Sequence, residues 1–249
     1  MLNINEHGEV CEIQLHRPPV NALNIELIEK LGAAIEEAGK HAGAVVLSGQ
    51  AGMFSAGLDV PALLALDRPD TERFVRSFFK LMETVARLPI PVACAITGHC
   101  PAGGTVLVIF ADYRIMCRGK YRMGLNEVKV GLTVPEVIQN AMVRLTGKRM
   151  GERLMVAGKL VLPDEALQVG LVDTLVDDSQ QAVSEAIGWC NDLLALPREA
   201  MLTTRQIARA DLGALFDDFG EDDISRFVAG WFDPATQTGL HNLVKKIRK

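Results

Sequence analysis

Apolar residues in the first half of the chain fall into short continuous runs, separated by stretches with helical spacing. The apolar runs predict four strands, at residues 10–15, 44–47, 91–96 and 113–116. Apolar residues three or four positions apart predict intervening helices, at about residues 24–40, 71–88 and 103–110. This alternation is typical of an α/β fold with a parallel or mixed sheet. Because the strands are almost wholly apolar, we expect both faces of the sheet to be covered.

The second half of the chain has a mostly helical pattern. Thr133 and Glu136 have the spacing of a capping box around Val134 and Pro135, which predicts a helix that starts at this point with Thr133 as its cap. A short segment at residues 171–175 then precedes a helical stretch at about 178–248. This stretch is either an appended lobe or an arm that packs on a neighbouring subunit.

Composition narrows the class of protein. The chain has 249 residues, which is enough to bury a large core without disulfide or metal support. Its net charge of -5 gives it no bulk electrostatic reason to bind nucleic acid or an anionic membrane. No apolar stretch reaches the roughly 18 residues that a membrane span needs. We therefore expect neither nucleic acid nor a membrane among its partners.

Cysteine usage favours a reducing compartment, and the spacing of cysteines and histidines does not predict a metal site. The chain has five cysteines, an odd number, and neither they nor the histidines have metal-ligand spacing. The opening residues MLNINEHGEV lack the basic and apolar regions of a secretory signal. The expected location is the cytoplasm.

Two segments share one design, a strand followed by a turn of small residues and then a helix. The first turn spans residues 54–60 (FSAGLDV) and the second spans residues 98–104 (GHCPAGG). Small residues let a ligand approach the backbone, and the first N–H groups of a helix have no acceptor within it. Two such N–H groups that converge would form an oxyanion hole. Either turn alone is better explained as a tight strand-to-helix connection, and no Gly-Lys-Ser/Thr follows to make a phosphate loop.

The ordered set of motifs resembles the crotonase (enoyl-CoA hydratase/isomerase) superfamily. The matching segments, which together cover most of residues 10–175, are HRPPVNALN (16–24), FSAGLD (54–59), the GxxxAGG element (98–104), GLNEVKVGLTVPE (124–136) and LPDEALQVGLVD (162–173). The resemblance implies a crotonase-like (ββα)n spiral α/β core with the acyl-CoA site in residues 1–175. It further implies a helical C-terminal region, residues 176–249, that takes part in trimerisation. The expected assembly is a homotrimer or a dimer of trimers.

The resemblance also implies where an acyl-CoA substrate binds. The thioester carbonyl would lie between the backbone N–H of Leu58 and that of Gly103, and the substrate site would be lined by Ala56, Gly57, Leu58, Asp59 and Val60. Asp59 lies in the first turn after the small residues, where an acidic side chain suits the helix dipole, so we interpret it as structural support beside the ligand. Coenzyme A would be part of the substrate, and no separate cofactor or metal is expected.

The carboxylates around this site favour one reaction. In this family hydration resembles a task for two carboxylates, and the position of the first is occupied here by Val106, which cannot transfer a proton. The second position matches Glu127, whose flanks are mostly apolar, and such surroundings raise the pKa of a carboxyl group and make it a better base near neutral pH. One carboxylate is enough to take a proton from C2 of a 3-enoyl thioester and return it at C4.

The strings CPAGG, GLNE and EALQVGLVD resemble mitochondrial-type Δ3,Δ2-enoyl-CoA isomerases more than hydratases. In that branch the glutamate is the catalytic base and the preceding asparagine contacts the acyl ligand, roles that the resemblance carries to Glu127 and Asn126. The leading hypothesis is thus isomerisation of 3-enoyl-CoA to 2-enoyl-CoA in fatty-acid degradation. The alternatives are another crotonase-type enzyme, a hydratase or a thioester hydrolase, and a non-catalytic CoA-ester-binding protein, for which Glu127 would be only a solvated loop charge.

Other polar residues are not assigned to catalysis. Glu136 is explained by its place at a helix start, and His99 has no evident carboxylate partner or nucleophile. The basic tail residues are candidates for binding the CoA phosphates, although such residues more often form a solvated helix end: Lys245, Lys246, Arg248 and Lys249.

Overall fold

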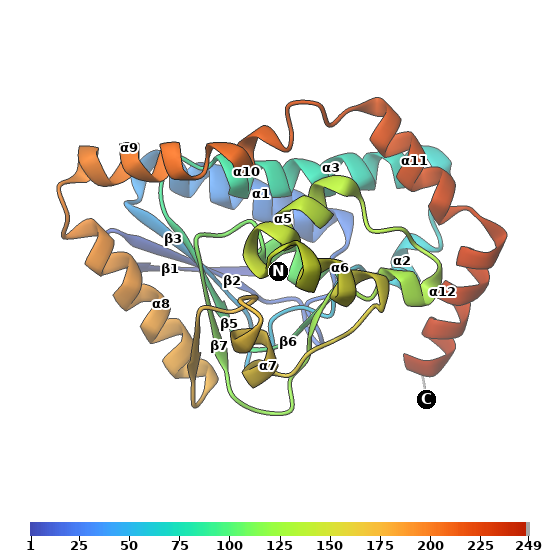
Figure 1. Cartoon of the computed structure of the whole chain (residues 1–249), viewed down its shortest axis with the longest axis horizontal. Helices are drawn as coiled ribbons and strands as arrows, with labels where there is room; N and C mark the ends of the chain where they lie inside the picture. Colours follow the sequence, from blue (N-terminus) through green and yellow to red (C-terminus); the bar gives the residue numbers. More distant parts are fainter. Residues whose placement is uncertain (248–249) are drawn as a thin grey trace.

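A six-stranded mixed sheet forms the centre of the molecule. The computed structural model describes residues 1–247, and Figure 1 shows the arrangement of their helices and strands. In spatial order the strands are β1 (Leu2–His7), β2 (Val10–Leu15), β3 (Ala44–Ser48), β5 (Val92–Ile96), β7 (Tyr113–Cys117) and β9 (Thr174–Val176). β1 and β2 pair antiparallel, and every other pair in this sheet is parallel. The prediction of a parallel or mixed sheet is confirmed.

Helices cover both faces of this sheet, and alternate strand residues point to each side. Val45 and Leu47 join the larger core with helices α1 (Ile25–His41) and α3 (Arg68–Arg87). Ala44 and Val46 face the opposite way and pack with α8 (Ser179–Leu194). In Figure 1, α8 accordingly lies on one side of the sheet, and α1 and α3 lie on the other. This double coverage explains why the central strands are wholly apolar.

The N-termini of the two long helices follow from local chemistry. Asn24 precedes α1 and its side chain accepts a hydrogen bond from the N–H of Leu27, while Asp67 does the same for Asp70 at the start of α3. α3 begins three residues earlier than the apolar spacing predicted, because Asp67 and the following Arg68-Pro69 provide a cap and a proline in the first turn.

A second, small sheet was not predicted. It consists of β4 (Gly52–Met53), β6 (Gly98–Pro101) and β8 (Met123–Gly124), all parallel. At its centre Gly98 lies directly against Gly52, where a Cβ atom on Gly98 would be only 1.9 Å from the Gly52 carbonyl carbon. Only glycine therefore fits at Gly98. The sheet brings three loops, distant in sequence, to the same place.

The remaining helices complete the fold and extend over the core. They are α2 (Val60–Leu63), α4 (Gly103–Val108), the 3-10 turn η1 (Glu127–Val130), α5 (Glu136–Thr146), α6 (Lys148–Val156), α7 (Pro163–Gln168), α9 (Arg198–Ala208), α10 (Ala210–Ala214), α11 (Glu221–Trp231) and α12 (Pro234–Ile247). After α8 the chain crosses α3 through α10 and α11 and returns to η1 and α2 through α12. The C-terminal third is helical as predicted, while its role in trimerisation stays a prediction. Within residues 1–247, no helix is long and apolar enough to cross a membrane.

The predicted capping box at Thr133 is wrong. α5 begins at Glu136 with Pro135 as its N-cap, and no side chain caps it. Pro135 has an extended backbone (φ -60°, ψ 148°), so the helix starts later than the motif implied and Thr133 lies two residues before the actual cap. The hydroxyl of Thr133 is consequently too far back to reach the first free N–H groups of α5.

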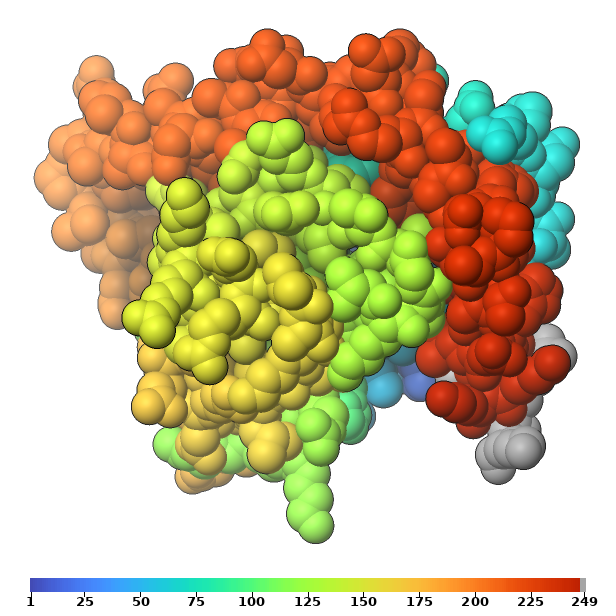
Figure 2. Space-filling model, turned by 45° about the vertical axis from the view of Figure 1, so that its right-hand side comes forward, coloured from blue at the N-terminus to red at the C-terminus, as the bar shows by residue number. Residues whose placement is uncertain are grey.

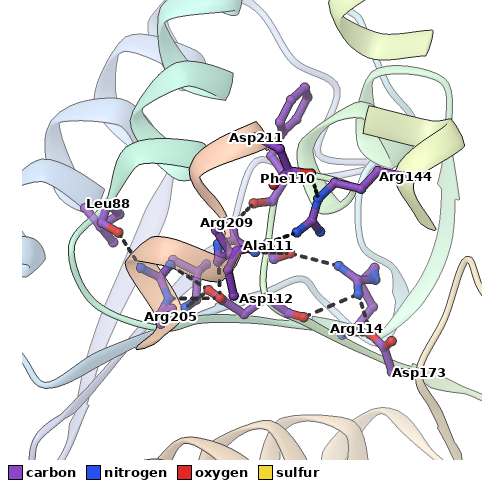
Figure 3. A network of polar contacts seen from close by, with 12 residues as sticks. Leu88, Phe110, Ala111, Asp112, Arg114, Arg144, Asp173, Arg205, Arg209 and Asp211 are labelled. Carbon is purple, nitrogen blue, oxygen red and sulfur yellow. Dashed lines mark hydrogen bonds and ion pairs between the residues drawn. The ribbon is translucent and has the colours of Figure 1, made fainter. Parts of the chain in front are cut away.

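A buried polar network joins the C-terminal helices to the sheet (Figure 3). Arg205 of α9 binds both carboxylate oxygens of Asp112, at 2.9 and 2.8 Å, and donates to the carbonyl of Leu88 at 2.7 Å. Arg209 donates to two carbonyls just before Asp112, and its Nε lies 3.2 Å from the carboxylate without hydrogen-bond geometry. Asp112 also accepts from the N–H of Val92. Its side chain is only 9% exposed, and within residues 1–247 it is the carboxylate that pairs with both of these buried guanidinium groups.

Replacing Asp112 with asparagine should therefore destabilise the protein by about 3 kcal/mol, because two buried cations lose their counter-charge. The matched control is Asp164→Asn, which removes a carboxylate that pairs with Arg118 but is 81% exposed, and which should cost under about 0.5 kcal/mol. Urea unfolding of the two variants measures the difference. Equal costs would contradict the assigned importance of Asp112.

Candidate active site

The first small-residue turn is held in place by a buried asparagine. Asn21 donates to the carbonyls of Leu15 and Phe54 at 3.1 and 3.0 Å, and its own carbonyl accepts from the Ser55 hydroxyl at 2.8 Å. The same hydroxyl accepts from the N–H of Gly57 at 3.1 Å. The loop at residues 16–24 and the FSAG segment are thereby joined into one rigid unit.

The two turns meet at Leu58 and Gly103. Leu23 bonds to the residues on either side of Leu58, because its N–H donates to the carbonyl of Gly57 and its carbonyl accepts from the N–H of Asp59. A Cβ built on Gly103 would lie 3.2 Å from the nitrogen of Leu58, so the two peptide groups are in contact. Within residues 1–247, neither the N–H of Leu58 nor that of Gly103 donates to a protein acceptor. Both donors are available to a ligand oxygen.

Backbone conformation at the second turn is unusual. Ala102, directly before Gly103, has φ 50° and ψ -123°, a region that costs a residue with a side chain about 1–3 kcal/mol. The N–H of Ala102 is held by the carbonyl of Gly124 at 2.8 Å. This bond ties the turn before α4 to β8, which leads to Asn126 and Glu127.

Thr105 makes a second tie between the same two segments. Its hydroxyl accepts from the N–H of Gly124 at 2.8 Å and donates to the carbonyl of Cys100. Sequence reasoning missed Thr105, together with Asn21 and Ser55, although all three are polar residues inside apolar or glycine-rich stretches and are now fully buried. That placement is the sequence signal that could have found them, since buried polar groups need hydrogen-bond partners.

Glu127 begins the 3-10 turn η1 and carries a carboxylate oxygen, Oε2, that is enclosed by protein and has no hydrogen-bond partner among the described residues. Burial raises the pKa of Glu127 from 4.5 to about 7, and the backbone amides of Glu127 and Asn126 offset part of that rise. Oδ1 of Asn126 is also enclosed without a partner. The neighbouring Lys129 does not compensate the carboxylate, because its side chain lies against Gly158. The expectation of a poorly hydrated carboxylate is thus supported by the surroundings of Glu127.

The carboxylate of Asp59 makes a helix-capping hydrogen bond and an ion pair. It accepts from the N–H of Ala62 at 3.1 Å, which caps α2, and it pairs with Arg17 at 2.7 Å. The N–H of Ala56 donates to the carbonyl of Val20 at 2.9 Å, and that of Val60 donates to Leu58 at 2.8 Å. Of the residues expected to line the substrate site, Leu58 therefore offers the free backbone donor.

The side chains of His99 and Glu136 make no contact with these groups among the interactions of residues 1–247, although the backbone carbonyl of His99 accepts from the N–H groups of Phe54 and Ser55 at 2.9 and 3.2 Å. Nδ1 of His99 accepts from the N–H of Arg122 at 3.2 Å, and the ring packs edge-on against Tyr121. Glu136 is exposed in the first turn of α5. Lys245 and Lys246 are exposed in the last turn of α12, while Arg248 and Lys249 lie outside the described residues. The substrate-binding and catalytic roles of all the named residues stay predictions.

Comparison with known proteins adds independent information. Residues 5–217 match the family model described as enoyl-CoA hydratase/isomerase. Human mitochondrial enoyl-CoA delta isomerase 1 is 28% identical over 244 residues, covering 96% of this chain and 80% of the human protein. The probable enoyl-CoA hydratase echA17 of Mycobacterium avium is 32% identical over 205 residues, covering 81% of this chain and 77% of that protein.

Similarity extends to the three-dimensional structure. The chain superposes on the crystal structure of human mitochondrial delta3-delta2-enoyl-CoA isomerase with a TM-score of 0.93 and 27% identity. The superposition covers 99% of this chain and 98% of the human one.

The raised pKa of Glu127 has a consequence for stability. The folded protein holds this proton more tightly than the unfolded chain, so the free energy of unfolding falls as pH rises from about 4.5 through about 7. Glu127→Gln, which stays neutral, should thus stabilise the protein by about 3 kcal/mol at pH ~8 and by under about 1 kcal/mol at pH ~5. Chemical unfolding at both pH values tests this, with the exposed Glu136→Gln as control. A gain for Glu127→Gln that does not depend on pH would contradict the burial of this carboxylate.

Proposed function

This chain belongs to the enoyl-CoA hydratase/isomerase (crotonase) family, and on that premise we propose that it converts 3-enoyl-CoA to 2-enoyl-CoA in fatty-acid degradation. Family and crotonase fold are as the sequence motifs predicted. The observation that carries the choice of reaction is the combination of two backbone donors, free within residues 1–247, with one enclosed carboxylate of raised pKa, that of Glu127. The similarity to human mitochondrial enoyl-CoA delta isomerase 1 supports the same choice.

The two free donors would bind the thioester oxygen. In the proposed mechanism the carbonyl lies between the N–H groups of Leu58 and Gly103, which stabilise the negative charge that develops on oxygen when C2 loses a proton. These donors are main-chain groups held by the contacts of Gly57 and Ala102, so they need no reorganisation during the reaction. Losing one such donor costs about 10²–10³ in rate.

Glu127 would carry the proton. Its ionised form takes a proton from C2, the electrons spread over the thioester and the former C3–C4 double bond, and the protonated carboxyl returns the proton at C4. The double bond then lies between C2 and C3, and no atom is gained or lost. Asn126, with its enclosed side-chain oxygen, is proposed to contact the acyl ligand. No metal or separate cofactor is required by this scheme.

Hydration is the second candidate reaction, favoured by the similarity to the probable hydratase of Mycobacterium avium. It is disfavoured by Val106, which is 2% exposed and apolar at the position where the family resemblance would require a second carboxylate. Thioester hydrolysis and CoA-ester binding without catalysis are left as outcomes of the assay below.

Purified protein should raise the ultraviolet absorbance of a 3-enoyl-CoA solution as the conjugated 2-enoyl-CoA forms. Glu127→Gln should lower kcat by about 10²–10⁴ while calorimetric binding of a saturated acyl-CoA persists, because only proton transfer is lost. Glu136→Gln, a change to an exposed carboxylate, is the control and should retain activity. Release of free CoA thiol, or 3-hydroxyacyl-CoA as the main product, would support the rival enzymes, and the absence of any conversion would support simple binding.

The rate should also depend on pH through Glu127. The base acts when ionised, so kcat/KM should rise with pH and reach half of its plateau near the pKa of about 7. Initial rates between pH ~5 and ~9 measure this profile. A rate that stays constant below pH ~6 would contradict Glu127 as the base.

A further inference from the structure

The helix α12 lies against the 3-10 turn that begins with Glu127. It contacts both η1 and α2, the short helix that follows Leu58. In Figure 2 the red surface of α12 borders the lime-green surface of the segment that follows residue 125. A segment distant in sequence therefore touches the turn that carries the proposed base.

The contact includes a specific hydrogen bond. Thr236 of α12 is 2% exposed, and its hydroxyl donates to the carbonyl of Gly131 at 3.0 Å. Gly131 ends η1 with φ +90°, and its N–H bonds to the carbonyl oxygens of Glu127 and Val128 inside the turn. A Cβ on Gly131 would lie 2.9 Å from Oγ1 of Thr236 and 3.2 Å from its Cα, so the two residues are in direct contact.

Two further features hold the helix in this position. Gly239 lies one turn beyond Thr236, and a Cβ there would be 2.6 Å from the carbonyl oxygen of Val130. Asp233 precedes the helix, and its carboxylate accepts from the N–H groups of Ala235 and Thr236 at 2.9 and 3.3 Å. The backbone of α12 is thereby fixed against the backbone of η1.

Glu127 depends on this support because no other side chain of residues 1–247 holds its carboxylate. Among the described residues, its carboxylate makes no hydrogen bond or ion pair with another side chain, and Oε2 is enclosed without a partner. Its direction is consequently set by the turn from which it projects.

We propose that Thr236 is a positioning residue, which fixes the end of η1 through Gly131 and so sets where the Glu127 carboxylate lies. Its effect on turnover rests on the proposed function, but its effect on Glu127 does not. A hydroxyl is required at residue 236 for this role, and the methyl group of threonine is not.

Three variants of α12 test the hydrogen bond. Thr236→Val keeps the shape and removes the donor, Thr236→Ser keeps the donor, and Thr238→Val is the control, because the exposed Thr238 bonds only to Pro234 in its own helix. Thr236→Val should lower kcat for the 3-enoyl-CoA about 10- to 100-fold with KM changed less than about 3-fold, as expected for a displaced base. Thr236→Ser should restore most of the rate, and Thr238→Val should match the unmodified protein.

A second pair of variants tests the contact without touching a hydroxyl. Gly239→Ala forces a methyl group against the carbonyl of Val130 and should reproduce the loss of Thr236→Val. Gly230→Ala, in α11, has no heavy atom within 4 Å of the new methyl group and should be silent. If Thr236→Val is too unstable to purify, the comparison of Gly239→Ala with Gly230→Ala still tests whether α12 positions Glu127.

A direct measurement of the Glu127 carboxyl separates this inference from the proposed function. Its titration is followed by carbon NMR of glutamate-labelled protein and assigned by the signal missing in Glu127→Gln. In Thr236→Val and Gly239→Ala, the midpoint should move from about 7 towards 4.5 by at least about half a unit, because the displaced carboxylate is better hydrated. Neither substitution changes a charge, so such a shift reports the surroundings of Glu127.

If the unmodified protein fails to convert enoyl-CoA, the proposed function is lost, but this titration still decides the role of Thr236. An unchanged Glu127 titration in both variants overturns the positioning role. So does a loss of kcat in Thr236→Val that Thr238→Val shares.

Discussion

The architecture of the site depends on one close contact, the approach of Gly98 to Gly52 in the small sheet. Any side chain at Gly98 would overlap the backbone of the neighbouring strand, since a Cβ would lie 1.9 Å from the Gly52 carbonyl carbon. This contact lets β4, β6 and β8 run side by side, and each of these short strands leads into a part of the site. β4 precedes Leu58, β6 precedes Gly103, and β8 precedes Glu127.

The chemical character of the site follows from the polar groups that lie just after these strands. Leu58 and Gly103 contribute neutral backbone donors, and Glu127 contributes a carboxylate that has no counter-charge among residues 1–247. A cation beside Glu127 would favour its ionised form and lower its pKa, which would weaken it as a base. Burying the Glu127 carboxyl group without a cation costs free energy of folding. The buried ion pairs lie elsewhere in the molecule, as at Asp112. Stability and reactivity are thus provided by separate parts of the molecule.

Much of this arrangement could be predicted from the sequence, because the main strands and helices have clear periodicity. β1 was missed because its residues LNINEH are mostly polar and exposed, so it has no apolar run. The strands of the small sheet are two to four residues long, and they exist only through contacts between distant segments. The family motifs predicted Leu58, Gly103 and Glu127 as site residues. No sequence motif links Thr236 to Gly131, because the two residues are 105 positions apart. Similarly, the capping-box spacing at Thr133 could not show that the helix would begin only after Pro135.

The hydrogen bond between Thr236 and Gly131 can form only after the last part of the chain has been synthesised. Its two residues are 105 positions apart, so a ribosome that adds about 5–20 residues per second makes the turn several seconds before its support. During that interval a nascent chain can already assemble the central strands and both glycine turns. It would then hold both glycine turns in place while Glu127 still lacks the support of α12. Under the proposed mechanism, the base would be positioned late in biosynthesis, as a separate step from folding of the sheet.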